Sequence, residues 1–169
     1  MRKADSLRGR WISYAAPLIP ASLVLLVDQV TKVVVRGNLA EGESVPEEGF
    51  LRITHLTNSG IIFGLDAPLA VSLVLPVLVL AVALFLYFRY GPFDGWLMNV
   101  AVALFVGGSL GNLLDRLILG HVTDFFDVRL WGGYHWPAFN VADVGILLGA
   151  ILFIVFVFKL RSGRAAEHV

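Results

Sequence analysis

The stretch APLAVSLVLPVLVLAVALFLYF, residues 67–88, decides the fold class, because it runs for 22 residues without a charged side chain. A helix needs about 20 apolar residues to cross a hydrocarbon core about 30 Å thick. Residues 95–114 form a second uncharged run, and residues 138–158 form a third with a single acid. Residues 11–27 are a fourth apolar run, and its pattern continues to residue 35. We therefore predict four transmembrane helices, at about 11–35, 67–90, 95–115 and 138–160.

The composition of the whole chain agrees with an integral-membrane protein. Hydrophobic residues make up 57% of the 169 residues and charged residues 15%, with a mean hydropathy of +0.79. Soluble domains carry about 25% charged residues, and disordered chains are less apolar still. The net charge of zero predicts no nucleic-acid partner. The lack of cysteine excludes a disulfide scaffold and thiol catalysis. We expect one domain over residues 1–169, and a monomer.

The distribution of Lys and Arg predicts the orientation in the membrane, because cytoplasmic loops carry the excess of these residues. Eight of them lie in the two terminal segments and in the link between the second and third spans, and five lie on the other side. Both termini should therefore be cytoplasmic, and the long loops 36–66 and 116–137 should face outward. The first span has no small-residue cleavage site after it, so we interpret it as a retained anchor rather than a signal peptide.

The outer loops carry signals for strands. Residues 51–57 are rich in β-branched and apolar side chains, and Asn58-Ser59-Gly60 then gives a turn signal. Residues 128–131 and 134–136 flank Gly132-Gly133 and predict a short hairpin. We expect a small β-sheet on the outer membrane surface, where aromatic side chains suit the interface. The aromatic candidates are Phe50, Trp131, Tyr134 and Trp136.

Several carboxylates should gather at one depth, just below the outer surface. Asp28 lies roughly 10 Å below the outer end of the first span, and Asp143 roughly 7 Å into the fourth, at about 1.5 Å per helical residue. Asp115 lies at the outer end of the third span, and Asp124 and Asp127 follow it in the outer loop. Ionisable groups inside membranes are expensive and usually functional.

Each of these polar residues also has a structural interpretation. Asp28 and Lys32 are four residues apart and can pair on one helix face. Asp115 and Arg116 can join a buried hydrogen-bonded network with Asn112.

The remaining polar and small residues have such interpretations too. Asn140 and Asp143 have the spacing of a helix N-cap with an acid in the first turn. Asp127 is expected to be a solvated loop acid. Two Gly-x-x-x-Gly patterns, at 107–111 and 145–149, predict close helix packing.

The chain offers no recognised metal or serine site. His121 and Asp124 could join a metal, but the His-Glu-x-x-His pattern is absent from the sequence. His55, His121 and His135 are expected to be interface residues. Ser109 has no histidine at a diagnostic spacing, and a Ser/His/Asp triad stays possible but unsupported. Two neighbouring carboxyls, in contrast, share a proton and can hydrolyse an amide without a metal or cofactor.

Five motifs, in order along nearly the whole chain, resemble those of the lipoprotein signal peptidase (signal peptidase II) family. The motifs are VDQVTK at 27–32, TNSG at 57–60, GNLLDR at 111–116, GHVTDF at 120–125 and FNVAD at 139–143. Members of this family often have Thr in place of Ser59 and small residues in place of Ile61 and Ile62. The bulkier pair here could alter the substrate groove.

The resemblance implies an aspartic endopeptidase of the bacterial cytoplasmic (inner) membrane, with its active site near the outer face. Such enzymes cleave diacylglyceryl-modified prolipoproteins just before the lipidated cysteine, contact membrane lipid and are inhibited by the cyclic peptide globomycin. The resemblance places the catalytic pair at Asp124 and Asp143. It assigns substrate or inhibitor contacts to Asn58, Gly60, Asn112, Arg116 and Asn140, and supporting roles to Asp28, Lys32 and Asp115.

Two other functions remain open from the residues alone. A proton- or ion-coupled transporter would use Asp28 and Asp143 as carriers in a relay. Carboxylates confined to one edge of the membrane argue against it, and so does the lack of an internal repeat. A non-enzymatic assembly factor would tolerate loss of the Asp124 and Asp143 carboxyls.

Overall fold

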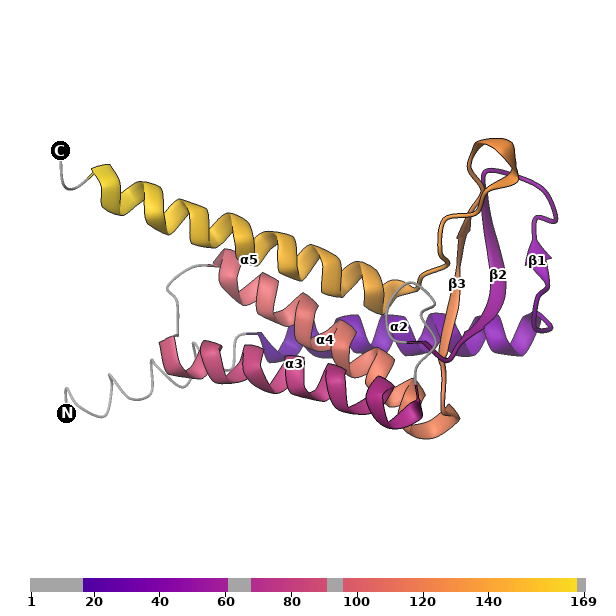
Figure 1. The fold of residues 1–169 in the computed structure, drawn as a ribbon, viewed down its shortest axis with the longest axis horizontal. Coiled ribbons are helices and arrows are strands. Elements are labelled where there is room, and N and C mark those ends of the chain that lie inside the picture. Colours follow the sequence, from indigo (N-terminus) through magenta and orange to yellow (C-terminus); the bar gives the residue numbers. More distant parts are fainter. Residues whose placement is uncertain (1–16, 61–67, 91–95, 167–169) are drawn as a thin grey trace.

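The computed structural model describes residues 17–60, 68–90 and 96–166, and four long helices dominate this part of the chain. They alternate in direction, and the small sheet lies at one end of the bundle (Figure 1). All four are long and apolar enough to cross a membrane, with mean hydropathy from 1.7 to 2.7. The helices are α2 (Leu18–Asn38), α3 (Leu69–Tyr90), α4 (Trp96–Leu119) and α5 (Val141–Ala166).

The helix boundaries refine the predicted spans. α2 continues three residues past the predicted end at 35, and the predicted start at 11 lies outside the described residues. α4 extends to Leu119, so Arg116 is on the helix and not in the loop. Apolar residues prolong α4 until Gly120, whose φ of +82° suits a helix end. The Gly120 N–H donates to the Arg116 carbonyl at 3.1 Å. α5 begins at Val141, later than predicted, and continues past 160 to Ala166.

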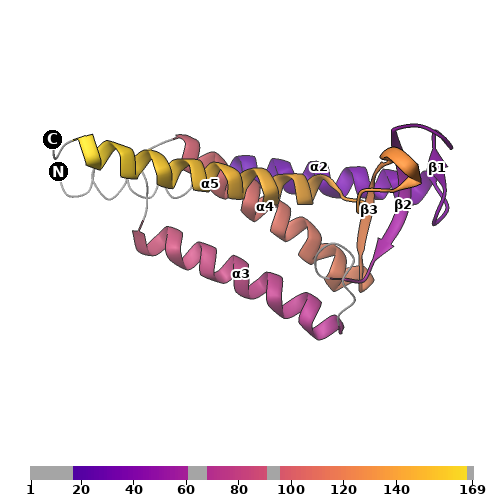
Figure 2. The ribbon, with the colours of Figure 1, turned by 45° about the horizontal axis from the view of Figure 1, so that its top comes forward.

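Glycines let α4 approach α2 and α5 closely, as the two small-residue patterns predicted. A Cβ added at Gly107 would lie 2.5 Å from the Ala21 carbonyl oxygen on α2. A Cβ at Gly149 would lie 2.7 Å from the Ala101 carbonyl oxygen on α4. Figure 2 shows α2, α4 and α5 together, with α3 further out. The close contacts therefore set the distances between the three helices, two of which, α2 and α4, carry half of the buried polar residues in the described part of the chain.

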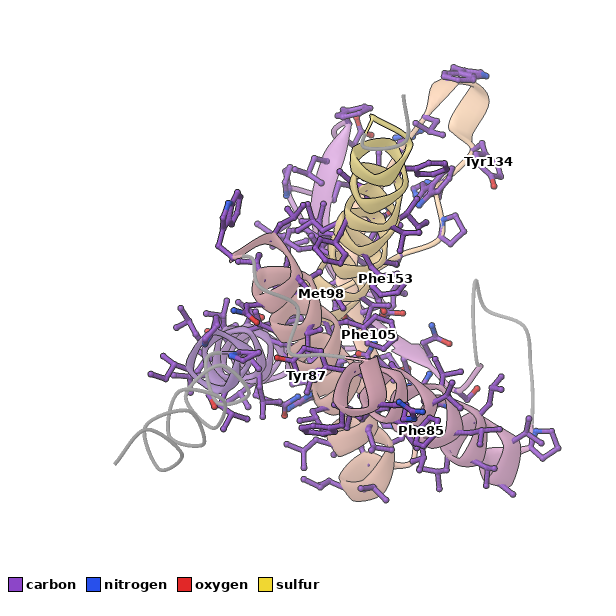
Figure 3. The ribbon with its side chains drawn as sticks, turned by 90° about the vertical axis from the view of Figure 1, so that its left-hand side faces the viewer. Phe85, Tyr87, Met98, Phe105, Tyr134 and Phe153 are labelled. Atoms are coloured by element: carbon purple, nitrogen blue, oxygen red, sulfur yellow. The ribbon has the colours of Figure 1, made fainter. Side chains whose placement is uncertain are left out.

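An apolar cavity of about 680 Å³ lies between α3, α4 and α5. Its lining includes Tyr87, Met98, Phe105 and Phe153, which Figure 3 labels. Met98 is only two residues from the start of α4, so the cavity reaches toward the end of the bundle opposite the sheet.

The sheet has three antiparallel strands in the order β1-β2-β3. They are β1 (Ser44–Val45), β2 (Leu51–Asn58) and β3 (Val122–Val128). Leu51 pairs with Val128 and Asn58 with Val122, and a register shift lies between Ile53 and Leu56. The predicted strand at 51–57 is confirmed within one residue. In Figure 1 the strands run across the ends of the helices.

The hairpin predicted at 128–136 is confirmed in part. The Trp136 N–H donates to the Val128 carbonyl at 2.8 Å and the Leu130 N–H to the Tyr134 carbonyl at 2.7 Å, but the turn is longer than the two residues predicted. The strand that pairs with β2 comes before it, at Val122–Val128, and residues 131–133 form the short 3-10 helix η1 (Trp131–Gly133). The chain does reverse here, because Arg129 and His135 form an isolated bridge. Gly132 and Gly133 have φ values of +69° and +78°, which suit a reversal but add no second strand to the sheet.

Candidate active site

Buried polar side chains gather where α2, α4 and α5 meet the sheet. The described residues place ten predicted site residues there, from five separate stretches of the chain. Four are carboxyls, and the others are two basic side chains, three asparagines and a glycine. They are Asp28, Lys32, Asn58, Gly60, Asn112, Asp115, Arg116, Asp124, Asn140 and Asp143.

A charged cluster of Asp28, Lys32 and Asp115 ties the helices together. Lys32 Nζ lies 2.8 Å from Asp28 Oδ2 and 3.2 Å from Asp115 Oδ2, and all three side chains are at most 1% exposed. Asp28 Oδ1 accepts the Ala142 N–H of α5 at 2.8 Å. Asp115 Oδ2 accepts the Thr123 N–H of β3 at 3.1 Å. The predicted Asp28–Lys32 pair is confirmed, and it extends to a third helix and to β3.

Asp143 caps its own helix together with Asn140. Asn140 Oδ1 accepts the Asp143 N–H at 2.9 Å, and Asp143 Oδ2 accepts the Asn140 N–H at 3.1 Å. This reciprocal pair is the capping arrangement that the spacing predicted. Asp143 Oδ1 accepts a further hydrogen bond from Asn112 Nδ2 at 2.7 Å. The carboxyl is therefore held through both of its oxygens.

Asp124 is held in the same way from β3. Its Oδ1 accepts from Asn140 Nδ2 at 2.7 Å, and its Oδ2 accepts from Asn58 Nδ2 at 2.8 Å. The side chain is buried. Burial, and then the charge of Asp143, raise the pKa of Asp124 to about 6 against the opposing effect of these two hydrogen bonds.

Asn140 joins the two carboxyls, because it contacts Asp124 through its side-chain amide and Asp143 through its oxygen and its backbone. We call the carboxyls of Asp124 and Asp143 the dyad. Each of the four dyad oxygens accepts a hydrogen bond from an amide group. The structure thus brings together the two aspartates that the resemblance singled out. They can share a proton beside a substrate, which is the chemistry that two neighbouring carboxyls support.

Arg116 connects the dyad to the turn after β2. Its Nη2 donates to the Gly60 carbonyl at 3.1 Å and its Nη1 to the Asn112 carbonyl at 3.4 Å. The Gly60 N–H in turn donates to Asn58 Oδ1 at 2.9 Å. Arg116 therefore joins the predicted network through backbone carbonyls and not through the Asp115 carboxylate. Its Nε is buried and has no hydrogen-bond partner within the described residues. Ile61 and Ile62 lie outside those residues.

Three residues that complete the network were not predicted from the sequence. Gln29 Nε2 donates to Asp115 Oδ1 at 3.2 Å and to the Gly111 carbonyl at 3.1 Å. Thr123 accepts from Arg36 Nη1 at 2.8 Å through its hydroxyl, besides its backbone contact with Asp115. Gln29 and Thr123 are polar residues inside the quoted motifs, which was an available signal. Ala142 acts through its backbone N–H, which leaves no trace in the sequence.

The expectation that Asp127 is solvated is wrong. Asp127 is 4% exposed, and Arg52 donates to its Oδ2 through both Nε and Nη2. Thr54 Oγ1 donates to the same oxygen at 3.2 Å, and His135 Nδ1 lies 2.7 Å from Oδ1. Burial alone would raise the pKa of Asp127, but His135 and Arg52 together lower it. Asp127 therefore links β2, β3 and the turn after β3.

The histidines divide between sheet and loop contacts. His135 belongs to the Asp127 cluster, and His55 Nδ1 lies 3.0 Å from the Leu39 carbonyl. Within residues 17–60, 68–90 and 96–166, no three His, Cys, Asp or Glu side chains are grouped as metal ligands would be.

The fold and this site define a multi-pass helical membrane protein with a carboxylate-rich centre at one end of its helices. A family model described as signal peptidase (SPase) II matches residues 20–159. The chain belongs to the signal peptidase II family, whose members are membrane peptidases that process lipoproteins.

Curated relatives and solved structures agree with this assignment. The lipoprotein signal peptidase of Geobacter sulfurreducens is 43% identical over 145 residues, which cover 83% of this chain and 90% of the relative. That of Moorella thermoacetica is 40% identical over 136 residues, covering 80% and 87%. A solved bacterial membrane enzyme, determined by the in meso method, superposes with a TM-score of 0.76 at 31% identity. It covers 87% of this chain and 90% of its own.

Proposed function

We propose that this chain is an aspartic endopeptidase that removes the signal peptide from diacylglyceryl-modified prolipoproteins, cleaving just before the lipidated cysteine. The observation that carries the proposal is the dyad, two carboxyls from β3 and α5 that contact one asparagine and are both hydrogen-bonded through every oxygen. Two neighbouring carboxyls cannot both ionise cheaply, so they share one proton over a range of pH.

In the proposed reaction, one carboxyl of the dyad is ionised and the other is protonated. The ionised carboxyl removes a proton from a water molecule, whose oxygen attacks the carbonyl carbon of the scissile peptide. The protonated carboxyl stabilises the developing charge on the carbonyl oxygen by donating to it. The raised pKa of Asp124, about 6, supports a carboxyl that keeps its proton closer to neutral pH than an ordinary aspartate would.

The surroundings of the dyad supply groups that could hold a peptide. Asn58, Gly60, Asn112, Arg116 and Asn140 all lie within the hydrogen-bonded network that reaches the dyad. The buried Nε of Arg116 is a donor without a partner in the described part of the chain, and a substrate carbonyl would satisfy it. We propose that these five residues contact the prolipoprotein, and that globomycin competes for the same groups.

The membrane setting fits a lipid-modified substrate. The charged cluster contacts β3 through Asp115, and the dyad joins β3 to the start of α5, so both lie at the sheet end of four helices that can cross a membrane. We propose that this end faces the outer side of the bacterial inner membrane, with both termini cytoplasmic and the sheet at the outer surface. The lipid chains of the substrate could then stay in the bilayer while the peptide reaches the dyad.

The transporter alternative is not favoured. The relatives named above are peptidases, and Asp28 contacts Lys32 and the start of α5 rather than a second carboxylate across the midplane. A proton or ion relay would need polar groups along the whole length of the bundle, from one membrane surface to the other.

A cleavage assay with purified enzyme and a diacylglyceryl prolipoprotein tests the proposal, read as a gel shift. The wild type should release the signal peptide. Asp124→Asn and Asp143→Asn should each lose nearly all cleavage, because Asn has a similar shape but cannot ionise or act as an acid–base partner. The double variant should be little worse than either single one, since members of one catalytic unit are not additive.

Two further variants serve as controls. Asp127→Asn removes another buried carboxyl from the same strand, and the folded fraction of this variant should cleave at a rate near that of the wild type. Glu48→Gln changes an exposed acid and should change nothing. Substantial cleavage by either dyad variant would contradict the aspartic mechanism.

A further inference from the structure

The asparagines around the dyad have fixed orientations, because the oxygen of each amide faces a group that can only donate. Lys32 Nζ donates to Asn112 Oδ1 at 2.9 Å. The Asp143 N–H donates to Asn140 Oδ1 at 2.9 Å, and the Gly60 N–H donates to Asn58 Oδ1 at 2.9 Å. An ammonium or a backbone N–H has no lone pair, so a flipped amide would place two donors against each other. The three NH₂ groups must therefore point to the dyad.

The two carboxyls of the dyad receive different kinds of donor. Asp124 accepts from the NH₂ groups of Asn58 and Asn140, which belong to neutral side chains. Asp143 accepts from Asn112, whose oxygen is bound by the Lys32 ammonium, and from a backbone N–H at the start of α5. A cation bound to the amide oxygen polarises the amide and strengthens its N–H as a donor. The positive end of the α5 helix dipole acts on Asp143 directly, through the Asn140 N–H. It reaches Asp124 only through the Asn140 side chain, whose oxygen accepts the Asp143 N–H.

The Lys32 ammonium is placed both to form ion pairs and to polarise the Asn112 amide. The side chain is 0% exposed, and its three N–H donors have three acceptors. Two of the acceptors are the carboxylates of Asp28 and Asp115, and the third is the Asn112 oxygen. Through the third contact, the Lys32 ammonium polarises the Asn112 amide. The Nδ2 of that amide donates to Asp143 Oδ1, so the charge of Lys32 favours the ionised form of Asp143.

We propose that Lys32 is a positioning residue that orients and polarises the Asn112 amide, so that the dyad enters the reaction with Asp143 ionised and Asp124 protonated. This inference rests on the proposed function and assigns a separate role to each aspartate. Asp143 is the base, Asp124 is the acid, and Lys32 acts on Asp143 through Asn112.

Other charges near the dyad are compatible with this assignment. The Arg116 guanidinium on α4 attracts Asp143 more than Asp124. The Lys32 ammonium also attracts Asp124, but as the weakest of the influences on that carboxyl. Asp28 on α2 is paired with Lys32 and accepts from α5, and Asp115 on α4 is paired with Lys32 and lies 3.7 Å from Arg36.

The assignment gives a balanced reaction. The Asp143 carboxylate takes a proton from water as the water oxygen bonds to the peptide carbon, and Asp124 gives its proton to the carbonyl oxygen. The resulting gem-diol breaks its C–N bond when Asp143 returns the proton to the leaving nitrogen. One diol hydroxyl then gives its proton to Asp124 and becomes the carbonyl of the new acid. The dyad ends in its starting protonation state.

The test is the pH dependence of kcat/KM for cleavage of a diacylglyceryl prolipoprotein by full-length enzyme carrying Lys32→Met. Without the ammonium, ionisation of Asp143 is less favourable, so the acid limb of the profile should move to higher pH by about one unit. Lys32→Met leaves two buried carboxylates unbalanced and could fail to fold. The double variant Asp28→Asn/Lys32→Met removes one charge of each sign and should shift the limb in the same direction by a smaller amount, because the Asp28 carboxylate that it also removes opposes ionisation of Asp143.

The matched control is Arg36→Met, which removes a cation one turn further along α2. Arg36 contacts Thr123 and Asp115 but not Asn112, so its acid limb should stay at the pH of the wild type. A purely structural role for Lys32 would lower kcat/KM by the same factor at every pH and leave the acid limb at the pH of the wild type, which would overturn the inference. If the wild type fails to cleave, or cleaves without needing both aspartates, the proposed function fails instead.

Discussion

At the scale of single residues, the Asp124 carboxyl makes the free energy of unfolding fall as the pH rises, which is the opposite of the usual effect of an aspartate. Its pKa is raised to about 6 in the folded protein by burial and the nearby charge of Asp143, against about 3.9 for an unfolded chain. Between these values the folded state holds a proton that the unfolded state has released. This carboxyl therefore contributes stability below about pH 4, and that stability is lost as the pH rises through about 6.

Asp124→Asn should remove this dependence. The difference in unfolding free energy, variant minus wild type, should rise by on the order of 2 kcal/mol as the pH is raised from about 4 to about 7. Thermal unfolding of both proteins in detergent at the two pH values measures the difference. Asp127→Asn is the control, because hydrogen bonds from His135 and Arg52 outweigh the burial of Asp127 and lower its pKa. Its contribution to stability changes only below about pH 4, so this variant should show no such gain between about pH 4 and about pH 7. Parallel stability curves for wild type and Asp124→Asn would contradict the raised pKa.

The sequence motifs predicted which side chains form the site but not all of the contacts that hold them. Ten polar and small positions were proposed from the sequence, and all ten lie in or beside one hydrogen-bonded network. Asp127 was misjudged because nothing local in the sequence indicates that Arg52, 75 residues away, donates to it. The backbone donors of Ala142 and Thr123 could not be predicted, since their contacts depend on how α5 and β3 are placed.

At the scale of elements, the helices were predictable and the third strand was not. Long uncharged runs determine α3 and α4 locally, and both were predicted within a few residues. β3 has no regular alternation, because Val122 to Phe125 are all buried, and its partner strand is shifted in register between Ile53 and Leu56. Such irregularities often re-aim side chains beside active sites. Here the shift lies between the pairings of Asp127 with Arg52 and of Asp124 with Leu56.

The contact between α2 and α4 gives a prediction at the same scale. A Cβ added at Gly111 would lie 2.5 Å from Asp28 Oδ2, and that carboxylate is fixed by Lys32 and Ala142. Gly111→Ala should therefore destabilise the bundle by about 1–3 kcal/mol through overpacking. Thermal unfolding of the purified protein measures the loss.

Gly37→Ala is the matched control, because it is also a helical glycine but has nothing within 4 Å of an added Cβ. It should be neutral or stabilise the protein by less than about 1 kcal/mol, since Ala favours helix more than Gly. Equal stability of the two variants would show that α2 and α4 can separate without loss.

At the scale of the whole molecule, orientation in the membrane is the property on which the proposed function depends. The four helices alternate in direction, so the start of α2 and the end of α5 share the end of the bundle opposite the sheet (Figure 1). The excess of Lys and Arg at the terminal segments predicts that this end is cytoplasmic. The dyad would then lie near the outer face, where the scissile bond of an exported precursor is found.

The chain contains no cysteine, so single cysteines can report this orientation without background. Glu48→Cys, in the exposed loop between β1 and β2, should react with a membrane-impermeant thiol reagent in intact cells whose outer membrane has been made permeable. Arg164→Cys, near the end of α5, should react only after the inner membrane is also opened. Reporter fusions after Arg164 and within residues 41–48 should agree. The reverse pattern would place the sheet and the dyad in the cytoplasm, where no exported prolipoprotein presents its cleavage site, and the proposed substrate would have to be abandoned.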